Sequence, residues 1–189
     1  MSKKSYITTN DKRRKDNLEN KIRGFEKLTT IKADIPIPTR GTALSAGYDI
    51  YVIHPDVYKA LVRGKSVKEA WDAVPKFKRT VRRHLFDKIM LPTGIKAYML
   101  ADEYLKIHIR SSSAVKEDLK IDNDVPIIDA DYYNNISNEG HIMIPLSNWS
   151  IKFDEPFKRI CQGIFTKYLV ADNDNASQKR IGGVGSTND

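Results

Sequence analysis

Apolar and polar residues alternate along the second half of the chain. Residues 105–110 alternate Leu and Ile with Lys, His and Arg, which is the period of a half-buried β-strand. The alternation returns at residues 142–146 and 151–153, and the turn signal Leu91-Pro92-Thr93-Gly94 precedes it. Many short strands separated by turns favour an all-β sandwich or barrel.

The first part of the chain repeats this pattern less regularly. Four apolar residues are spaced among polar ones and prolines, which predicts an edge strand leading into a loop. They are Leu28, Ile31, Ile35 and Ile37. Residues 46–52 predict a turn followed by a short strand.

Residues 55–87 follow a helical period instead. Residues 66–69, Ser-Val-Lys-Glu, match a helix capping box, and apolar residues follow at helical spacing as far as Pro75. Further along, three apolar side chains share one helical face and most of the cations lie opposite. They are Phe77, Val81 and Leu85. We therefore expect an inserted helical element at about residues 55–87.

Composition divides the chain into three segments. Residues 1–24 are polar and charged, which predicts a basic N-terminal extension outside the core. Residues 25–170 form one domain that contains the insertion. Residues 171–189 are rich in Asp, Asn, Ser and Gly, which predicts a flexible C-terminal arm.

Charge indicates the class of partner. The 189-residue chain has a formal net charge of +8 and an isoelectric point of about 9.4, which favours nucleotides, nucleic acid or polyphosphate. Cations cluster at residues 12–15 and again at residues 76–84. Each cluster taken alone is more simply a solvated face, but the basic insertion is a candidate for contact with nucleic acid or protein.

The single cysteine, Cys161, cannot form an internal disulfide. Its neighbours are largely apolar, so we interpret it as core filler and not as a nucleophile. No apolar run is long enough to span a membrane, and the basic N-terminus is not followed by the apolar stretch of a secretory signal. These features predict a cytoplasmic, reducing location without membrane contact.

The segment Ile127-Ile128-Asp129-Ala130-Asp131-Tyr132 runs from two β-formers into two carboxylates and an aromatic ring. Read as a strand entering a turn, it buries both isoleucines and presents Asp129 and Tyr132 at the edge of the core. A carboxylate in that place can polarise a water, and a Tyr ring can form the wall of a ligand site. An acidic turn explains the same residues equally well.

Other segments also carry groups that suit a nucleoside triphosphate. Asp49 could hold a hard cation or cap its own turn. Arg110 and the serines after it could grip phosphate, or the serines could cap a short helix beginning at Ala114. Asn123 suits the edge of a pyrimidine. Gln162 could donate to phosphate, although a satisfied core amide is the simpler interpretation.

These segments, in this order, resemble the five motifs of the homotrimeric dUTP pyrophosphatase (dUTPase) family. The motifs lie at residues 46–49, 110–114, 123 with 128–132, 159–162, and 180–187, where three glycines accompany Arg, Ser and Thr. The match covers about residues 25–54 and 89–189. Ordered agreement of five separated motifs is a highly specific signal.

The resemblance implies a fold and an activity. Members of the family are β-barrels of the jelly-roll type that assemble as trimers and share active sites between subunits. With Mg2+ they hydrolyse dUTP to dUMP and pyrophosphate, which limits uracil incorporation into DNA and supplies dUMP for dTMP synthesis.

The resemblance also implies roles for individual residues. Asp129 would activate the attacking water, and Arg180 would stabilise charge in the transition state. Tyr132 would pack on the deoxyribose, Asn123 would pair with uracil, and Asp49 would hold the waters of the metal. The phosphate ligands would be Arg110, Ser111, Ser112, Arg159 and Gln162. The arm residues closing over the substrate would be Gly183, Val184, Gly185, Ser186 and Thr187.

The chain departs from the family pattern at several positions. Val184 stands where an aromatic residue is usual, Pro126 where Gly is usual, and Ser112 and Ser113 where Gly and Leu are usual. Tyr133-Asn134 replaces Arg-Gly, and residues 135–140 predict an enlarged hairpin. These changes put the stacking on uracil and the selectivity for it in question.

Two other functions remain open. A dCTP deaminase of the same fold superfamily would use a Glu as its proton carrier and lack the glycine-rich arm, so the Asp129 turn and the arm favour a dUTPase. A regulatory or nucleic-acid-binding protein on this fold would use the cations of the insertion and bind less tightly as salt rises.

Overall fold

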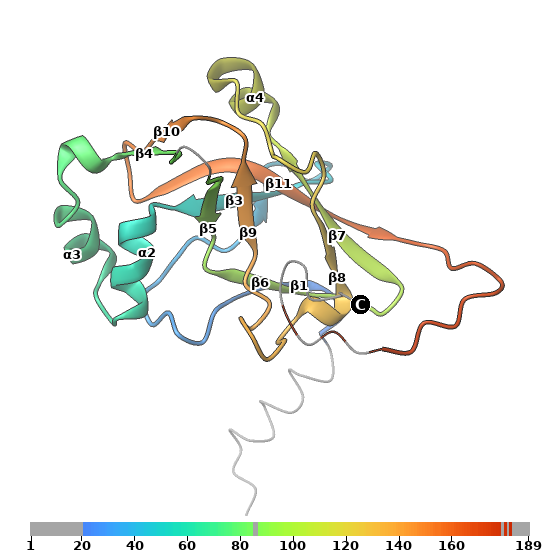
Figure 1. Ribbon diagram of the computed structural model, residues 1–189. Coiled ribbons are helices and arrows are strands. Elements are labelled where there is room, and N and C mark those ends of the chain that lie inside the picture. Colours follow the sequence, from blue (N-terminus) through green and yellow to red (C-terminus); the bar gives the residue numbers. More distant parts are fainter. Residues whose placement is uncertain (1–20, 85–86, 179, 181, 183–189) are drawn as a thin grey trace, which may run out of the picture.

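The computed structural model describes residues 21–84, 87–178, 180 and 182, and strands dominate this part of the chain (Figure 1). The strands are β1 (Gly24–Lys27), β2 (Thr39–Arg40), β3 (Tyr48–Ile53), β4 (Thr80–Arg82), β5 (Ile89–Pro92), β6 (Ile95–Tyr98), β7 (Glu103–Ile109), β8 (Ile127–Asp129), β9 (Met143–Leu146), β10 (Ser150–Lys152) and β11 (Phe157–Lys167). The helices are α2 (Pro55–Val62), α3 (Val67–Asp72), α4 (Ser111–Glu117) and the short 3-10 helices η1 (Lys76–Lys78) and η2 (Ala130–Tyr132).

One antiparallel sheet of five strands, in the order β2-β3-β11-β7-β8, forms the main layer. The strand pairs β5-β9, β1-β6 and β4-β10 complete the structure, and β5 and β9 cross over β3 and β11 (Figure 1). The core lies between these layers, where Ile50, Ile107 and Ile144 are fully buried. The all-β prediction, including the strands at residues 105–110, 142–146 and 151–153, is confirmed.

One detail of the strand predicted at β8 is wrong. The pattern predicts Ile127 in the core, but its side chain is 51% exposed. In the register of this edge strand Ile128 lies opposite the buried Leu105, whereas Ile127 lies opposite Lys106. Because side chains alternate across a strand, Ile127 shares the outward face with Lys106.

The predicted strand leading into a loop is present as β1, but it ends at Lys27, before the four apolar residues on which the prediction rested. Leu28, Ile31 and Ile35 are buried, but no strand is assigned between Lys27 and Thr39. This loop packs on the turn between β5 and β6, where Gly94 has φ +73° and a Cβ would lie 2.8 Å from Ile31 Cδ1. Burial here comes from a close-packed loop, which strand periodicity does not describe.

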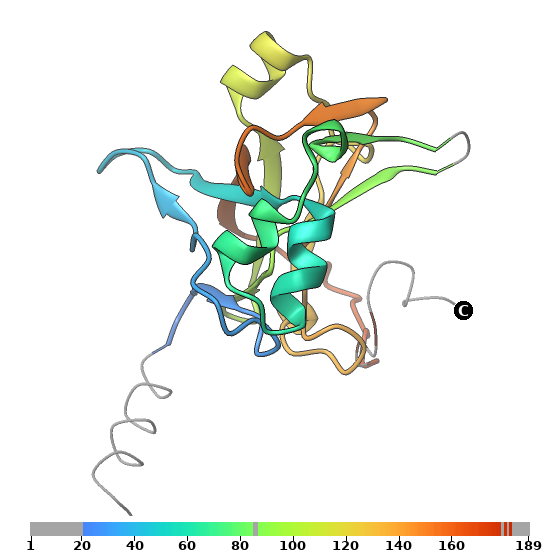
Figure 2. The ribbon, with the colours of Figure 1, turned by 90° about the vertical axis from the view of Figure 1, so that its left-hand side faces the viewer.

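The insertion is helical only in its first half (Figure 2). Helices α2 and α3 are present, and Ser66 and Glu69 form the predicted capping box. The helix predicted beyond Pro75 is wrong, because η1 ends after one turn and β4 pairs with β10. In this pair Val81 lies opposite the buried Ile151, and its side chain packs against the core. Phe77, which precedes the strand, is 81% exposed.

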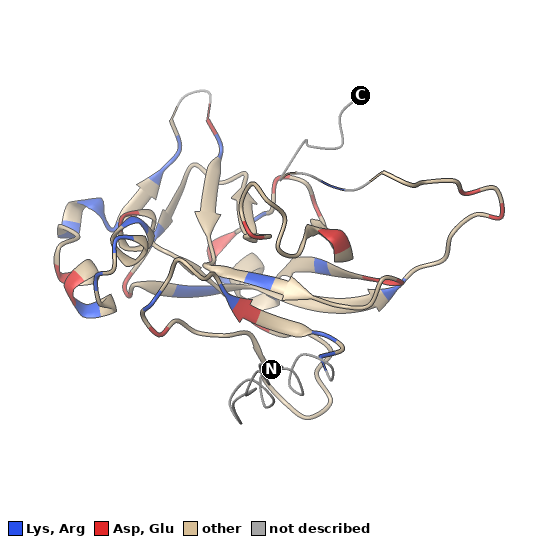
Figure 3. Ribbon diagram, turned by 90° about the horizontal axis from the view of Figure 1, so that it is seen from below, with Lys and Arg blue, Asp and Glu red and all other residues tan. Residues whose placement is uncertain are grey.

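The insertion also carries most of the net charge. Residues 55–87 contain nine Lys or Arg and four Asp or Glu, a net charge of +5 against +8 for the whole chain. Lys and Arg positions therefore concentrate around α3 and along the strand that follows it (Figure 3).

Cys161 is fully buried in β11, as predicted, and burial raises the pKa of its thiol to about 12. In the part of the chain that the structure describes, no helix is both long and apolar enough to cross a membrane. Most of the predicted N-terminal extension and the end of the predicted C-terminal arm lie outside the described residues, as does Leu85.

Candidate active site

Asp129 stands where β8 turns into η2. It pairs with Tyr104 at the edge of the main sheet and occupies the N-cap position of η2 without capping it through its side chain. Its carboxylate is therefore not used by the local backbone, and its side chain is 47% exposed. Tyr132 ends η2 and is buried. The sequence prediction of a strand that delivers Asp129 and Tyr132 to the edge of the core is confirmed.

Arg180 reaches this turn from the C-terminal segment. Its Nη2 donates to Asp129 Oδ2 at 2.5 Å and its Nε donates to Asp131 Oδ1 at 3.1 Å. The guanidinium carbon lies 5.7 Å from the centre of the Tyr132 ring. The structure thus brings together Asp129 and Arg180, the two groups to which the family resemblance assigns catalytic roles, although they are 51 residues apart in sequence.

A cavity of about 430 Å³ opens beside Asp129. Asn123, Tyr132 and Arg180 contribute polar groups to its lining. Its apolar lining comes largely from Ile127, Ile128, Met90, Met143, Pro126 and Pro145. An apolar cavity with a few convergent polar groups is typical of a small-molecule site.

Met143 and Pro145 were not predicted as site residues. Both lie on β9 between the buried Ile142, Ile144 and Leu146. The alternation that places those three residues in the core also places the two between them on the opposite face. That signal is present in the sequence, but it does not say that the opposite face lines a cavity.

Hydrogen bonds from the loop after η2 fix Tyr132 in place. The Tyr132 hydroxyl donates to the backbone oxygen of His141 (3.2 Å) and accepts from Asn138 Nδ2 (2.9 Å). Asn135 Nδ2 donates to the backbone oxygen of Tyr132 (2.9 Å) and to Asn138 Oδ1 (2.7 Å). These polar groups are satisfied inside the loop, so the Tyr132 side chain and backbone are both held.

A second group of predicted residues gathers around Asp49, at the start of β3. Its Oδ1 lies 2.8 Å from Arg110 Nε and its Oδ2 lies 2.9 Å from Arg159 Nη1. The two guanidinium groups share one largely buried carboxylate, which orients both of them. Arg110 Nη1 also donates to Ser112 Oγ at 3.2 Å.

The backbone of β11 helps to place Arg159 and Gln162. The register with β3 shifts between Arg159 and Cys161, and such a bulge changes the direction in which side chains point. Gln162 lies opposite Asp49, and a Cβ at Gly47 would be 2.3 Å from Gln162 Oε1. The glycine of the first motif therefore leaves room for the glutamine of the fourth.

The serines after Arg110 do not cap the helix as one interpretation proposed. Helix α4 begins at Ser111, three residues earlier than expected, with Arg110 at the N-cap and no side-chain cap. Ser111 is exposed and Ser113 is buried. Ser112 instead faces Arg110 and lines a cavity.

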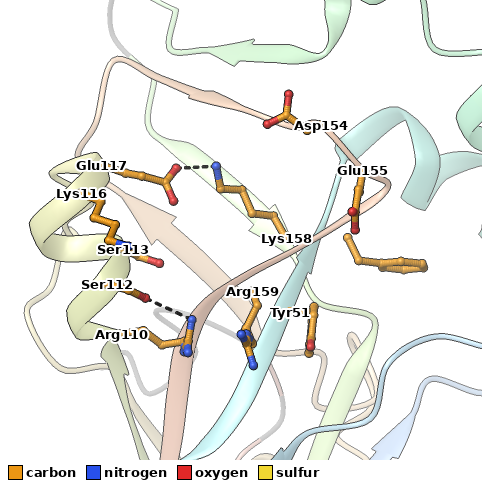
Figure 4. Close-up of a pocket in the computed structure, with 11 residues that line it drawn as sticks. Tyr51, Arg110, Ser112, Ser113, Lys116, Glu117, Asp154, Glu155, Lys158 and Arg159 are labelled. Carbon is orange, nitrogen blue, oxygen red and sulfur yellow. Dashed lines mark hydrogen bonds and ion pairs between the residues drawn. The ribbon is translucent and has the colours of Figure 1, made fainter.

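This second cavity, of about 560 Å³, lies between α4 and the start of β11 (Figure 4). Arg110, Arg159, Lys116 and Lys158 give it four cations, and Lys158 is paired with Glu117. Lys116 and Lys158 were not predicted. Lys116 follows Ser112 by one helical turn, which was the only signal for it in the sequence.

The two cavities lie at opposite ends of β7. Asp129 pairs with Tyr104 near the start of this strand, whereas Arg110 directly follows its end. At ~3.3 Å per residue the stretch from Tyr104 to Arg110 spans about 20 Å. The cavities share no lining residue, and Figure 1 shows α4 and β8 well apart. The remaining predicted residues, Gly183, Val184, Gly185, Ser186 and Thr187, lie outside the described residues.

The sequence is similar to that of a bacterial enzyme. It is 40% identical over 172 residues to the deoxyuridine 5'-triphosphate nucleotidohydrolase of Lactococcus lactis subsp. lactis (strain IL1403), and the match covers 88% of this chain and 98% of that protein. No family model matches the chain.

Solved structures of dUTPases share the fold. The dUTPase from Streptococcus mutans matches with a TM-score of 0.59 and 31% identity, covering 79% of this chain and 99% of that one. The dUTPase from phage phi11 of S. aureus, whose structure visualises a species-specific insert, matches with a TM-score of 0.52 and 13% identity, covering 84% and 97%. A mutant of the phi11 enzyme, whose structure reveals the coordination of a structural Mg(II) ion, matches with a TM-score of 0.51 at 13% identity, covering 84% and 98%.

The all-β structure agrees with the jelly-roll fold that the motifs implied, and the sequence match extends over almost the full length of the bacterial enzyme. The chain belongs to the dUTPase family.

Proposed function

We propose that this protein hydrolyses dUTP to dUMP and pyrophosphate. The observation that carries the proposal is the position of Asp129, a half-exposed carboxylate at the mouth of a cavity with a largely apolar lining, contacted by Arg180. Family membership supplies the reaction, and this geometry supplies a base for it. The reaction would limit uracil incorporation into DNA and supply dUMP for dTMP synthesis, and we place it in the cytoplasm.

Asp129 would accept a proton from a water and orient that water toward the α-phosphorus. The water oxygen forms a bond to phosphorus as the bond to the bridging oxygen of pyrophosphate breaks. A carboxylate can do this when it lies within hydrogen-bond reach of the water. Arg180, which contacts Asp129 in this structure, would move its charge to the phosphate oxygens as charge develops there.

Tyr132 and Asn123 would select the nucleoside. Both line the cavity beside Asp129. Tyr132 would pack against the deoxyribose and leave no space for a 2′-hydroxyl, while the Asn123 amide would pair with uracil. The largely apolar lining that includes Met143 and Pro145 would receive the flat base.

The cavity beside α4 would bind the phosphates. Arg110, Arg159 and Ser112 line it and are oriented by Asp49 and by each other. Fixed guanidinium groups suit phosphate oxygens because they present paired donors. Ser111 and Gln162 would add donors, and the arm residues 183–187 would complete the enclosure.

The residues present fit Mg2+ only if the substrate carries it. The described residues contain no cluster of three or more His, Cys, Asp or Glu that could hold a metal. Mg2+ often keeps several waters and binds through substrate phosphates with one or two carboxylates. Asp49, already paired with two arginines, would accept hydrogen bonds from the waters of the ion. The ion would neutralise charge on the leaving pyrophosphate.

The distance along β7 supports an active site shared between subunits. A triphosphate whose α-phosphorus is attacked beside Asp129 cannot also reach Arg110 of the same chain, about 20 Å away along the strand. Each site would therefore combine the Asp129 cavity of one subunit with the Arg110 cavity of another. Such a head-to-tail arrangement closes into a ring, and a homotrimer is the assembly we propose.

The test is pyrophosphate release from dUTP, dTTP, dCTP and UTP with Mg2+. We expect strong preference for dUTP, and the Asp129→Asn variant should lose at least ~100-fold in rate while keeping its fold, since general-base catalysis contributes that much. Asp131→Asn is the matched control, because Asp131 also contacts Arg180 but does not line the cavity with Tyr132. Comparable turnover of dCTP or UTP would refute the specificity, and equal losses in the two variants would refute the role of Asp129.

A further inference from the structure

The outward face of the β4-β10 pair is a basic surface that dUTP hydrolysis does not use. In the register of this pair Arg82 lies opposite Ser150 and Thr80 lies opposite Lys152. Val81 and Ile151, which alternate with them, face the core. The four outward side chains are therefore two cations and two hydroxyl groups, a set that suits phosphate oxygens.

Exposed aromatic rings flank this surface at both ends. Phe77 is 81% exposed and lies between Lys76 and Lys78 in η1, directly before β4. Trp149 is 64% exposed and directly precedes β10. The Arg83 guanidinium lies 5.0 Å from the centre of the Trp149 ring. Each end of the surface therefore offers an aromatic face next to a cation.

We propose that this surface, formed by η1, β4, β10, Phe77 and Trp149, binds single-stranded nucleic acid. Cations and hydroxyl groups would contact the phosphates, and the two rings would stack on bases. Single-strand binding proteins combine these same two elements, a positive track and aromatic platforms. The extended stretch from Thr80 to Arg83 alone is about 10 Å long at ~3.3 Å per residue, and η1 lengthens the surface beyond Thr80, so it meets more than one nucleotide.

The flanking rings favour a nucleic acid over an acidic protein. The net charge of +5 in residues 55–87 suits either partner. The rings, however, add stacking surfaces that unpaired bases require and that carboxylates do not. A duplex would hide its bases from these rings, which favours a single strand.

The surface is separate from both cavities proposed for dUTP. Of its residues, none lines the cavity beside Asp129 or the cavity beside Arg110. Variants of this surface should therefore leave dUTP turnover unchanged. A failure to bind nucleic acid would leave the proposal of dUTP hydrolysis intact, and a failure to hydrolyse dUTP would leave the proposal of nucleic-acid binding intact.

The test measures fluorescence anisotropy of a labelled oligo-dT across a salt series. Lys76→Gln/Lys78→Gln/Arg82→Gln should weaken binding at least ~10-fold and reduce the slope of log K against log salt by up to ~2, since each lost phosphate contact removes ~0.7 from a single-strand slope. Phe77→Ala/Trp149→Ala should also weaken binding at least ~10-fold, because two stacking platforms are lost, with the slope unchanged.

The matched control removes three cations from α2 and the turn after it, as Lys59→Gln/Arg63→Gln/Lys65→Gln. Both triple variants lower the net charge equally. Apart from that shared effect, the control should change the affinity for oligo-dT by less than about twofold. Equal losses in the control and in the surface variant would overturn the proposal, as would an unchanged affinity after loss of both rings. Tighter binding to a polyglutamate peptide than to oligo-dT would instead identify an acidic protein as the partner and also overturn it.

Discussion

Asp129 and Asp131 show how much local geometry separates two identical side chains. Both pair with the same guanidinium, and both are about half exposed. Only Asp129 lies on the strand that borders the cavity with Tyr132. The local pattern Asp-x-Asp predicts only an acidic turn. The three-dimensional structure shows which of the two carboxylates lines the cavity.

Tyr132 gives a prediction at the same scale. Asn138→Ala removes the donor to the Tyr132 hydroxyl and the partner of Asn135, so the ring should gain freedom to move away from the sugar. We expect the ratio of kcat/KM for dUTP to that for UTP to fall about tenfold, the value of one lost hydrogen bond of ~1.4 kcal/mol. Steady-state kinetics with both nucleotides measures this ratio.

Ile136→Ala is the control for that variant, because Ile136 lies in the same loop and is almost fully exposed. It should leave the ratio unchanged. If Asn138→Ala slowed both nucleotides equally, its role would be structural and the positioning of Tyr132 would not depend on it.

At the scale of elements, His141 ties the loop after η2 to two other parts of the fold. Its Nε2 accepts from the backbone N–H of Gly94 at 3.0 Å, and its ring stacks on Tyr58 of α2 with centres 5.1 Å apart. Burial lowers the pKa of His141 to about 4. The imidazole is therefore neutral in the folded protein over a range in which it would be charged after unfolding.

This shift predicts a loss of stability in weak acid. Because the pKa of His141 is about 4 when folded and ordinarily 6.5, the unfolded state binds the proton first, and stability falls as pH drops from about 6.5 toward 4. The loss approaches roughly 3 kcal/mol. Burial also lowers the pKa of His54, which acts in the same direction.

Denaturant unfolding at pH 7.5 and pH 4.5 checks the sign and size of this effect. His141→Gln keeps an acceptor for Gly94 but cannot titrate, so its stability should change less between the two pH values than that of the parent. His84→Gln, at an exposed position, is the control. A parent protein more stable at pH 4.5 than at pH 7.5 would contradict the prediction.

Elements are predicted well from the sequence where local and tertiary preferences agree. Strand β7 alternates, pairs on both sides and buries alternate residues, so its period predicts it correctly. The capping box at Ser66 is correct because it is a local interaction. The helix predicted from Lys76 to Asp87 is wrong because β10, about 70 residues away, offers a partner for Val81 that no local pattern shows. Helical spacing and strand pairing compete there, and the tertiary contact decides.

At the scale of the whole molecule, the order of the motifs identifies the family but not how its parts meet. Asp49, Arg110 and Arg159 come together within one chain, and so do Asp129 and Arg180. The two groups lie at opposite ends of β7, which the sequence could not show because strand register and chain crossing set that separation.

Subunit sharing predicts complementation between two inactive variants. Asp129→Asn and Arg110→Ala should each abolish turnover alone, since every site lacks one required group. Co-expressed with different tags and purified as mixed trimers, they should recover activity, because some sites combine the intact Asp129 of one chain with the intact Arg110 of another. Random mixing gives about a quarter of the sites both groups.

Steady-state dUTP turnover of the mixed preparation measures this recovery. A sample made by mixing the two purified variants without subunit exchange is the control and should stay inactive. Absence of any recovery in verified mixed trimers would mean that Asp129 and Arg110 act in the same chain, and the shared-site proposal would fail.

The burial of Cys161 has a practical consequence for studying the arm. With a thiol pKa of about 12 and no exposed surface, this sole cysteine holds almost no thiolate at neutral pH and resists alkylating reagents. The parent protein should therefore not react with maleimides, and Cys161 need not be replaced before labelling. A Ser177→Cys substitution on the exposed segment before Arg180 would then carry a single fluorophore, and its emission during turnover would test the proposed closure of the arm.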